Sequence, residues 1–138
     1  MEKSIILANE ISEIGRLADF IEDMGNEFSL APDVRFNINL VLEEAVANII
    51  NYAYPKDEHE SIYLSARMHE DSIVLVLTDT GKEFDPTQAP EADITLSAEE
   101  RPIGGLGIFL IRRIMQRVEY HRIDGNNILT MVKSIEAE

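Results

Sequence analysis

The spacing of apolar residues in the first half of the chain predicts one strand followed by two helices. Residues 3–8 form a short apolar run of the kind found in strands. From Ser12 onward apolar residues fall at helical spacing, and Gly25-Asn26 is the predicted end of this first helix. A second helix opens at Pro32, since proline is favoured at the first helical position, and it runs to about Tyr54. The apolar stripes are Ile14, Leu17, Ala18 and Ile21 in the first helix, and Val34, Ile38, Val41, Leu42, Ala45 and Ile49 in the second.

The second half of the chain predicts two hairpins, with a long loop and a third helix between them. Glu70-Asp71 suits the turn of the first hairpin, and Asp124-Gly125-Asn126 suits that of the second. Residues 80–104 lack sustained periodicity, and a loop of that length in a compact domain is usually functional or disordered. The third helix is predicted from Gly105 to Arg117. The four strands are 61–69, 72–79, 118–123 and 127–133, and the apolar positions of the helix are Leu106, Phe109, Leu110 and Ile114.

This order of elements predicts an α+β fold. A strand, two helices, a hairpin, a long loop, a helix and a second hairpin give a two-layer α/β sandwich, in which an antiparallel or mixed, mostly antiparallel sheet carries its helices on one face. The 138 residues are 45% hydrophobic, which is enough to bury a core without metal or disulfide support. We therefore expect one domain over residues 1–138.

Composition excludes several classes of function. Cysteine is absent, which rules out disulfide frameworks, thiolate metal sites and cysteine nucleophiles. The N-terminus lacks a basic segment followed by a long apolar run, and no stretch approaches the roughly 20 apolar residues of a membrane span. We expect a cytoplasmic protein that has no membrane segment.

The charge of the chain argues against direct nucleic-acid binding. The formal net charge is -14 and the isoelectric point is near 4.5, whereas phosphate-backbone binding depends on clustered Lys and Arg. Basic residues nevertheless gather in one short region, which is either a solvated helix face or a surface for phosphate or a protein partner. These residues are Arg101, Arg112, Arg113, Arg117 and Arg122.

A polar sector of the second helix is the first candidate site. Asn37, Glu44, Asn48 and Asn51 project from a narrow part of the helix surface, away from the apolar stripe. Asparagine is a mediocre helix former, so the sector suggests a polar pocket wall. An Asn oxygen can coordinate a hard cation, and a Glu can accept a proton from an attacking hydroxyl. Asn side chains that bond to an adjacent loop would explain the same pattern.

Two glycine-containing turns are the other candidates. At the end of a strand, Asp79 can accept from an exocyclic amine such as that of adenine, and Gly81 lets the backbone approach a flat ring, although turns use both residue types constantly. Residues 103–107, Ile-Gly-Gly-Leu-Gly, stand at the start of a helix, where free N–H groups form an anion site suited to nucleotide phosphates. The pattern of a P-loop is absent.

Together the three motifs resemble those of a known superfamily. Glu44 to Asn48 (EAVAN), Asp79-Thr80-Gly81 and Gly105-Leu106-Gly107 are similar in order and spacing to the N, G1 and G2 boxes of the histidine-kinase-like ATPases. Within that superfamily, the segments EEAVANIINYAYP, DTGKEFDP and RPIGGLGIFLIRRIMQRVEY look most like the anti-sigma-factor serine kinases. The resemblance covers essentially the whole chain.

The resemblance implies a role for each motif. ATP would lie between the second helix and a lid formed by residues 82–104, and Arg101 in that lid is the candidate for γ-phosphate stabilisation. Glu83 stands where the G1 box usually has a second glycine, which puts that position's part in nucleotide binding in doubt. The other implied roles are a general base for Glu44, a magnesium ligand for Asn48, adenine recognition for Asp79 with Gly81, and phosphate binding for Gly105, Leu106 and Gly107.

The implied function is that of a serine protein kinase which uses ATP and magnesium (Mg2+) and also acts as an anti-sigma factor. It would phosphorylate a small anti-anti-sigma (antagonist) protein, sequester a sigma factor and form a homodimer. A nucleotide-dependent protein-binding switch without efficient phosphotransfer is the alternative. Asn48 and Asp79 would serve either function, whereas Glu44 favours the kinase. A purely structural domain would leave the long loop and the polar helix sector unexplained.

Overall fold

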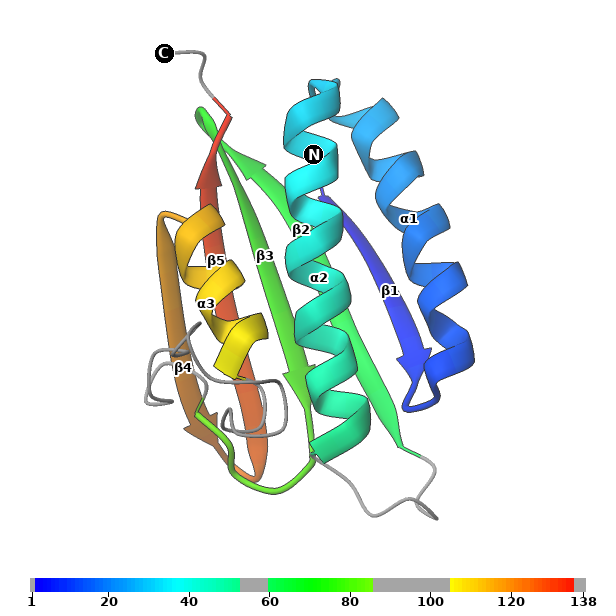
Figure 1. Cartoon of the computed structure of the whole chain (residues 1–138), viewed down its shortest axis with the longest axis vertical. Coiled ribbons are helices and arrows are strands. Elements are labelled where there is room, and N and C mark those ends of the chain that lie inside the picture. Colours follow the sequence, from blue (N-terminus) through cyan, green and yellow to red (C-terminus); the bar gives the residue numbers. More distant parts are fainter. Residues whose placement is uncertain (1, 53–59, 86–104, 136–138) are drawn as a thin grey trace.

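The computed structural model describes residues 2–52, 60–85 and 105–135, and within them three α-helices cover one face of a five-stranded sheet (Figure 1). All pairings between the described strands are antiparallel, in the order β1-β2-β3-β5-β4. The α+β two-layer prediction is thus confirmed. The elements are β1 (Glu2–Ala8), a 3-10 turn (Ile11–Glu13), α1 (Ile14–Glu27), α2 (Pro32–Tyr52), β2 (Ser61–His69), β3 (Ser72–Asp79), α3 (Gly105–Ile114), β4 (Arg117–Ile123) and β5 (Asn126–Ser134).

Most predicted boundaries lie within two residues of the observed ones. The second helix is described as far as Tyr52, so its predicted end at Tyr54 lies outside the described residues. Most of the predicted long loop, residues 86–104, also lies outside them. Asp124 and Gly125 both have positive φ, as the two-residue turn of the β4–β5 hairpin requires. No helix in the described ranges is long and apolar enough to cross a membrane.

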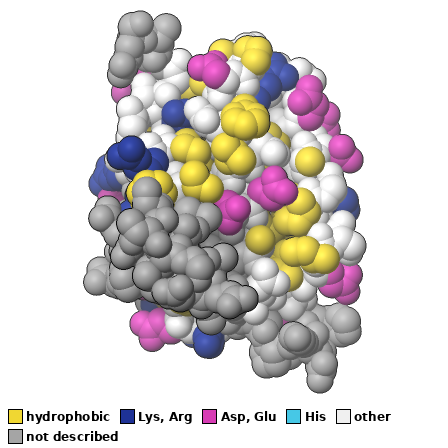
Figure 2. Space-filling model, viewed as in Figure 1, with side chains coloured by type: hydrophobic (Ala, Val, Ile, Leu, Met, Phe, Trp, Pro, Cys, Tyr) yellow, Lys and Arg dark blue, Asp and Glu magenta, His cyan; other side chains and the backbone are white. Residues whose placement is uncertain are grey.

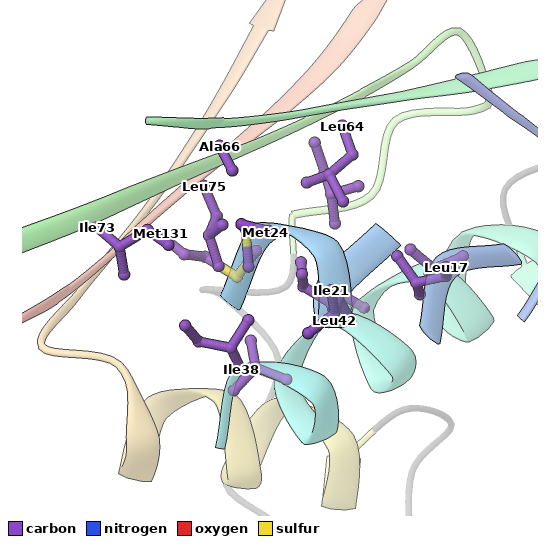
Figure 3. Packing of buried hydrophobic residues seen from close by; sticks show 14 of the residues in the cluster. Leu17, Ile21, Met24, Ile38, Leu42, Leu64, Ala66, Ile73, Leu75 and Met131 are labelled. Atoms are coloured by element: carbon purple, nitrogen blue, oxygen red, sulfur yellow. The ribbon is translucent and has the colours of Figure 1, made fainter. Parts of the chain in front are cut away.

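The core lies between the helices and the sheet. Figure 3 shows side chains of α1 and α2, including Met24, Ile38 and Leu42, that lie toward side chains of the sheet. These three residues are fully buried, as are Leu75 of β3 and Met131 of β5. Each such side chain contributes about 1.5–3 kcal/mol through removal from water. This layer holds α2 against β3, and the candidate site lies beside that contact.

The first helix continues to Glu27, one residue beyond its predicted end at Gly25-Asn26. Its end is a Schellman turn, in which Ser29 has φ 54° and the Leu30 N–H donates to the Gly25 carbonyl at 2.9 Å. Gly25 has a packing role instead: a Cβ there would lie 2.7 Å from Cδ of Arg35 on α2. The glycine signal therefore marks a close contact between α1 and α2.

The predicted apolar stripe is correct for α2 and partly wrong for the other helices. In α1, Ala18 is exposed. The third helix ends at Ile114 rather than Arg117, because Gln116 bonds through its N–H to Val132 of β5 and the chain passes into β4. Its buried residues are Ile108 and Ile111, whereas Phe109, Leu110 and Ile114 are half-buried. For residues 105–107 the structure describes the backbone but not the side chains.

Candidate functional site

A pocket opens between α2 and α3 above the end of β3, with an empty volume of about 470 Å³ including its mouth. Ala45 and Ile49 of α2 form one apolar wall, and Ile108 and Ile111 of α3 form the other. Phe84, in the segment after β3, also contributes. Apolar walls of this kind suit a flat aromatic ring.

Two rows of residues cross the sheet at the floor of the pocket, and all of them except the exposed Arg122 line it. Leu77 of β3 pairs with Leu129 of β5, which pairs with Tyr120 of β4. Two residues further along, Asp79 pairs with Asn127, which pairs with Arg122. Partners that lie opposite each other in antiparallel strands share a face. The sheet therefore places one apolar and one polar row side by side beneath the helices.

Asp79 is buried at the polar end of this floor, with a relative exposure of 4%. The Gly81 N–H and the Nδ2 of Asn127 each donate to its Oδ1 at 2.9 Å. Within the described residues these are the hydrogen bonds of its side chain, so Oδ2 is left to accept from a ligand. The turn from Asp79 to Gly81 is thus closed by the bond between the Asp79 side chain and the Gly81 backbone.

Asn48 lines the same pocket from α2, so the fold brings the N-box and G1-box residues together. Its Nδ2 is buried and has no hydrogen-bond partner in the described part of the chain. An unpaired buried amide costs about 1–3 kcal/mol, which a polar ligand would offset. The Asn48 amide also carries an oxygen of the type that a hard cation prefers, so this position fits a magnesium ligand. The described residues contain no cluster of three or more His, Asp or Glu that could hold a metal.

The rest of the polar sector of α2 is spread more widely than predicted. Of its four side chains, Asn48 is the one that lines the pocket of the described structure. Glu44 is half-buried one helical turn before it, Asn37 is half-buried further along the helix, and Asn51 is exposed. The sector is therefore a pocket wall at Asn48 and a helix surface elsewhere.

The glycine-rich motif is only partly described. Gly105 is the first residue of α3, and Ile108, in the first turn of that helix, lines the pocket. The backbone of Gly105, Leu106 and Gly107 therefore belongs to the same helical turn as a pocket residue. Arg101 and the lid residues 86–104 lie outside the described residues. Glu83 is exposed.

Two side chains of the β4–β5 hairpin, Asn127 and Tyr120, were not predicted as site residues, and Arg122 was named only as a member of the basic cluster. Asn127 is buried, with 6% exposure, and its Nδ2 donates to Asp79 and also to the Lys82 carbonyl at 2.9 Å. Tyr120 and Arg122 each donate to the Asn127 Oδ1. Burial raises the pKa of the Tyr120 hydroxyl above its ordinary value of 10.0, and the negative charge of Glu83 adds to this effect. The hydroxyl therefore remains a donor at neutral pH.

Three of the arginines that were predicted to form a basic cluster have separate partners in the described structure. Arg122 donates to the Gly81 carbonyl at 2.7 Å, beside the pocket. Arg117 pairs with Glu119, and the Arg113 guanidinium lies 5.5 Å from the ring centre of Phe109. On the helix-covered face, acidic and hydrophobic side chains are interspersed, and Lys and Arg side chains lie in separate small groups (Figure 2).

Comparison with known proteins identifies the family. Residues 7–133 match the profile described as "Histidine kinase-like ATPase domain". The chain belongs to this family. It is 34% identical over 98 residues to the serine/threonine-protein kinase BtrW of Bordetella bronchiseptica, an alignment that covers 71% of this chain and 69% of that protein. It is 28% identical over 142 residues to the serine-protein kinase RsbW of Halalkalibacterium halodurans, covering 100% of this chain and 85% of the relative.

Solved structures agree with this fold assignment. A Mycobacterium tuberculosis structure of RsbU and RsbW domains superposes with a TM-score of 0.71 at 14% identity, over 100% of this chain and 33% of that longer chain. A histidine kinase domain from Erythrobacter litoralis gives a TM-score of 0.57 at 12% identity, over 91% of this chain and 60% of that one. The resemblance to the anti-sigma-factor serine kinases, which rested on the segments around the three motifs, is thus confirmed by the family and the relatives.

Proposed function

We propose that this protein is an ATP-dependent serine protein kinase and anti-sigma factor, which phosphorylates a small anti-anti-sigma protein and sequesters a sigma factor. The observation that carries the proposal is the pocket that joins Asp79 and Asn48 between α2 and α3. Its apolar walls suit the adenine ring, and Asp79, the one carboxylate among the described residues that line it, suits the adenine amine. The names of BtrW and RsbW, both protein kinases, support the transfer of phosphate to a protein serine.

In this proposal the described side chains bind and orient ATP. The free oxygen of Asp79 accepts from the adenine amine, with Gly81 beside it, and the start of α3 at Gly105, Leu106 and Gly107 offers N–H groups to the phosphates. Asn48 would hold Mg2+, which when bound neutralises charge on the phosphate oxygens. Arg101, outside the described residues, stays the candidate for γ-phosphate stabilisation.

Glu44 is the proposed general base. It lies on α2 one turn from Asn48, and helical neighbours four residues apart share a face. The serine Oγ attacks the γ-phosphorus, its proton passes to the Glu44 carboxylate, and the bond from the γ-phosphorus to the bridging oxygen of ADP breaks. The Glu44 side chain is half-buried, so it can be reached by a docked protein.

The protein partners and the setting form part of the same proposal. A cytoplasmic homodimer that binds a sigma factor and an antagonist protein is consistent with the family and with a net charge unsuited to nucleic acid. A nucleotide-dependent switch without phosphotransfer is less favoured, because both relatives carry kinase names.

A phosphotransfer assay with labelled ATP and the cognate antagonist protein tests the proposal. Glu44→Gln keeps the shape of the side chain but removes the base, so transfer should fall by roughly 10²–10⁴-fold while nucleotide affinity stays within about tenfold. Glu43→Gln is the matched control, since Glu43 is the exposed neighbour on the same helix and should leave the rate unchanged. Asn48→Ala should instead weaken nucleotide binding in the presence of Mg2+.

Two results would contradict the proposal. Transfer by Glu44→Gln at the wild-type rate would remove the general-base role. Selective ATP binding without transfer to any candidate antagonist would favour the switch.

A further inference from the structure

The buried amide of Asn127 lies directly beneath the pocket, opposite Asp79. Among the described residues, Asp79 and Asn127 are the two polar side chains that are buried, with exposures of 4% and 6%. They face each other across β3 and β5. A buried carboxylate and a buried amide in contact would be costly unless their hydrogen bonds were complete.

The hydrogen bonds of Asn127 use both ends of its amide. An amide has two donor hydrogens and two acceptor positions. Nδ2 donates at 2.9 Å to the Asp79 Oδ1 and at 2.9 Å to the Lys82 carbonyl. Oδ1 accepts from the Tyr120 hydroxyl and, at 3.0 Å, from Arg122. All four positions are filled.

This arrangement fixes which way the amide points. A reversed amide would place its NH2 group against the Arg122 guanidinium, which can only donate, and its oxygen against two acceptors, the Asp79 Oδ1 and the Lys82 carbonyl. The Asp79 Oδ1 is therefore held by two N–H donors, from Asn127 and Gly81, and the rotation of the carboxylate is restricted. Its Oδ2 remains the oxygen available to a ligand in the pocket.

We propose that Asn127 is a positioning residue for nucleobase selection, which holds Asp79 so that one carboxylate oxygen faces the base, while Tyr120 and Arg122 fix the Asn127 amide. The proposal rests on the proposed function only in that the pocket binds the base of a nucleotide. A fixed acceptor favours a base with an exocyclic amine at this edge, as in adenine. It disfavours the oxo group that guanine carries at the same position, because two acceptors would then meet.

The test compares ADP with GDP, because both carry the same ribose and phosphates. Dissociation constants measured by calorimetry give a selectivity ratio. Asn127→Ala should lower the preference for ADP by about tenfold or more, mainly through weaker ADP binding, with GDP affinity changed by less than about threefold. Thr130→Ala is the matched control, because Thr130 lies on the same strand but on the opposite face of the sheet from Asn127, and it should leave the ratio unchanged.

A milder pair of changes covers the case in which Asn127→Ala does not fold. Tyr120→Phe removes one hydroxyl and should lower the ADP preference by about two- to fivefold, since Arg122 still holds the Asn127 oxygen. Combining it with Arg122→Leu, whose side chain has no donor, releases that oxygen and should lower the preference further. A structural loosening would instead weaken ADP and GDP equally.

The outcomes separate this proposal from the kinase proposal. An unchanged ratio in folded Asn127→Ala or in the folded double variant would refute the positioning role alone, as would equal losses for ADP and GDP. Wild-type protein that binds ADP and GDP equally would refute base selection by Asp79 and the role of Asn127 with it. Wild-type protein that prefers ADP but transfers no phosphate would overturn the kinase proposal and leave the role of Asn127 standing.

Discussion

Replacement of Asp79 by asparagine tests the adenine contact with the least change in shape. Two donors, the Gly81 N–H and the Asn127 Nδ2, converge on the Oδ1 of the native carboxylate. In Asp79→Asn the new amide must keep its oxygen at that position, because its NH2 group would otherwise meet both donors. The NH2 group then occupies the position of Oδ2 and faces the pocket. A donor would therefore replace the acceptor that the adenine amine needs.

The size of the effect follows from this forced orientation. A buried polar mismatch costs about 1–3 kcal/mol, so affinity for ADP should fall by about 5- to 150-fold. GDP should not suffer this loss, since its oxo group can accept from the new NH2. The fold should survive, because the amide oxygen still accepts from both internal donors.

Calorimetric titration of ADP and GDP into the folded variant provides the measurement. Asp71→Asn is the control, since Asp71 is exposed in the β2–β3 turn and its substitution should leave both affinities unchanged. ADP affinity equal to that of wild type, in a variant with a native unfolding transition, would remove Asp79 from the adenine site. Equal losses of ADP and GDP would show that the change acts on the pocket as a whole.

Two further predictions concern stability. Gly25→Ala should lower the free energy of unfolding by about 1 kcal/mol in urea titrations, because the gain in helix propensity is smaller than the cost of displacing Arg35, whose Nε bonds to the Leu30 carbonyl at 2.8 Å. Gly15→Ala should raise the free energy of unfolding by about 0.5 kcal/mol, because beyond its chain neighbours and its own helix backbone no described atom lies within 4 Å of the new Cβ. The reverse order would refute the packing role of Gly25. The Ala8 N–H and Arg16 hold the pKa of Glu13 below its ordinary value of 4.5, so its contribution to stability is complete above pH 4.5 and is lost as the pH falls through the lowered pKa. The difference in unfolding free energy between wild type and Glu13→Gln should accordingly shrink on acidification below pH 4.5, and a difference that stays constant to pH 3 would contradict this linkage.

The fold was predictable because its signals are local. Alternating or continuous apolar runs gave the strands, and the stripe of α2 from Val34 to Ile49 faces the core as its period required. The errors arose where the local signal was ambiguous. The third helix is apolar around most of its circumference, so its period did not show that Ile108 and Ile111, rather than Phe109 and Leu110, face the core.

Two residues of the candidate site could be predicted from local sequence signals. Asn48 and Asp79 stand out within their own segments, one as an unusual residue for a helix surface and the other as a carboxylate at a strand end. Their convergence on one pocket was implied by the family resemblance and is a property of the described fold. Glu44 lies one helical turn from Asn48. Its proposed role as general base depends on where ATP and the protein serine bind, which the residue pattern of α2 does not determine.

Asn127 could not be predicted in this way, because its significance depends on strand register. In sequence it follows a hairpin turn, where asparagine is common and usually structural. Only the pairing of β3 with β5 places it opposite Asp79, and only the pairing of β4 with β5 places Arg122 opposite Asn127. A shift of either register by one residue would turn these side chains to the other face of the sheet. The Leu77–Leu129–Tyr120 row, which is buried or half-buried beneath the helices, opposes such a shift, so apolar packing sets the geometry of the polar row beside it.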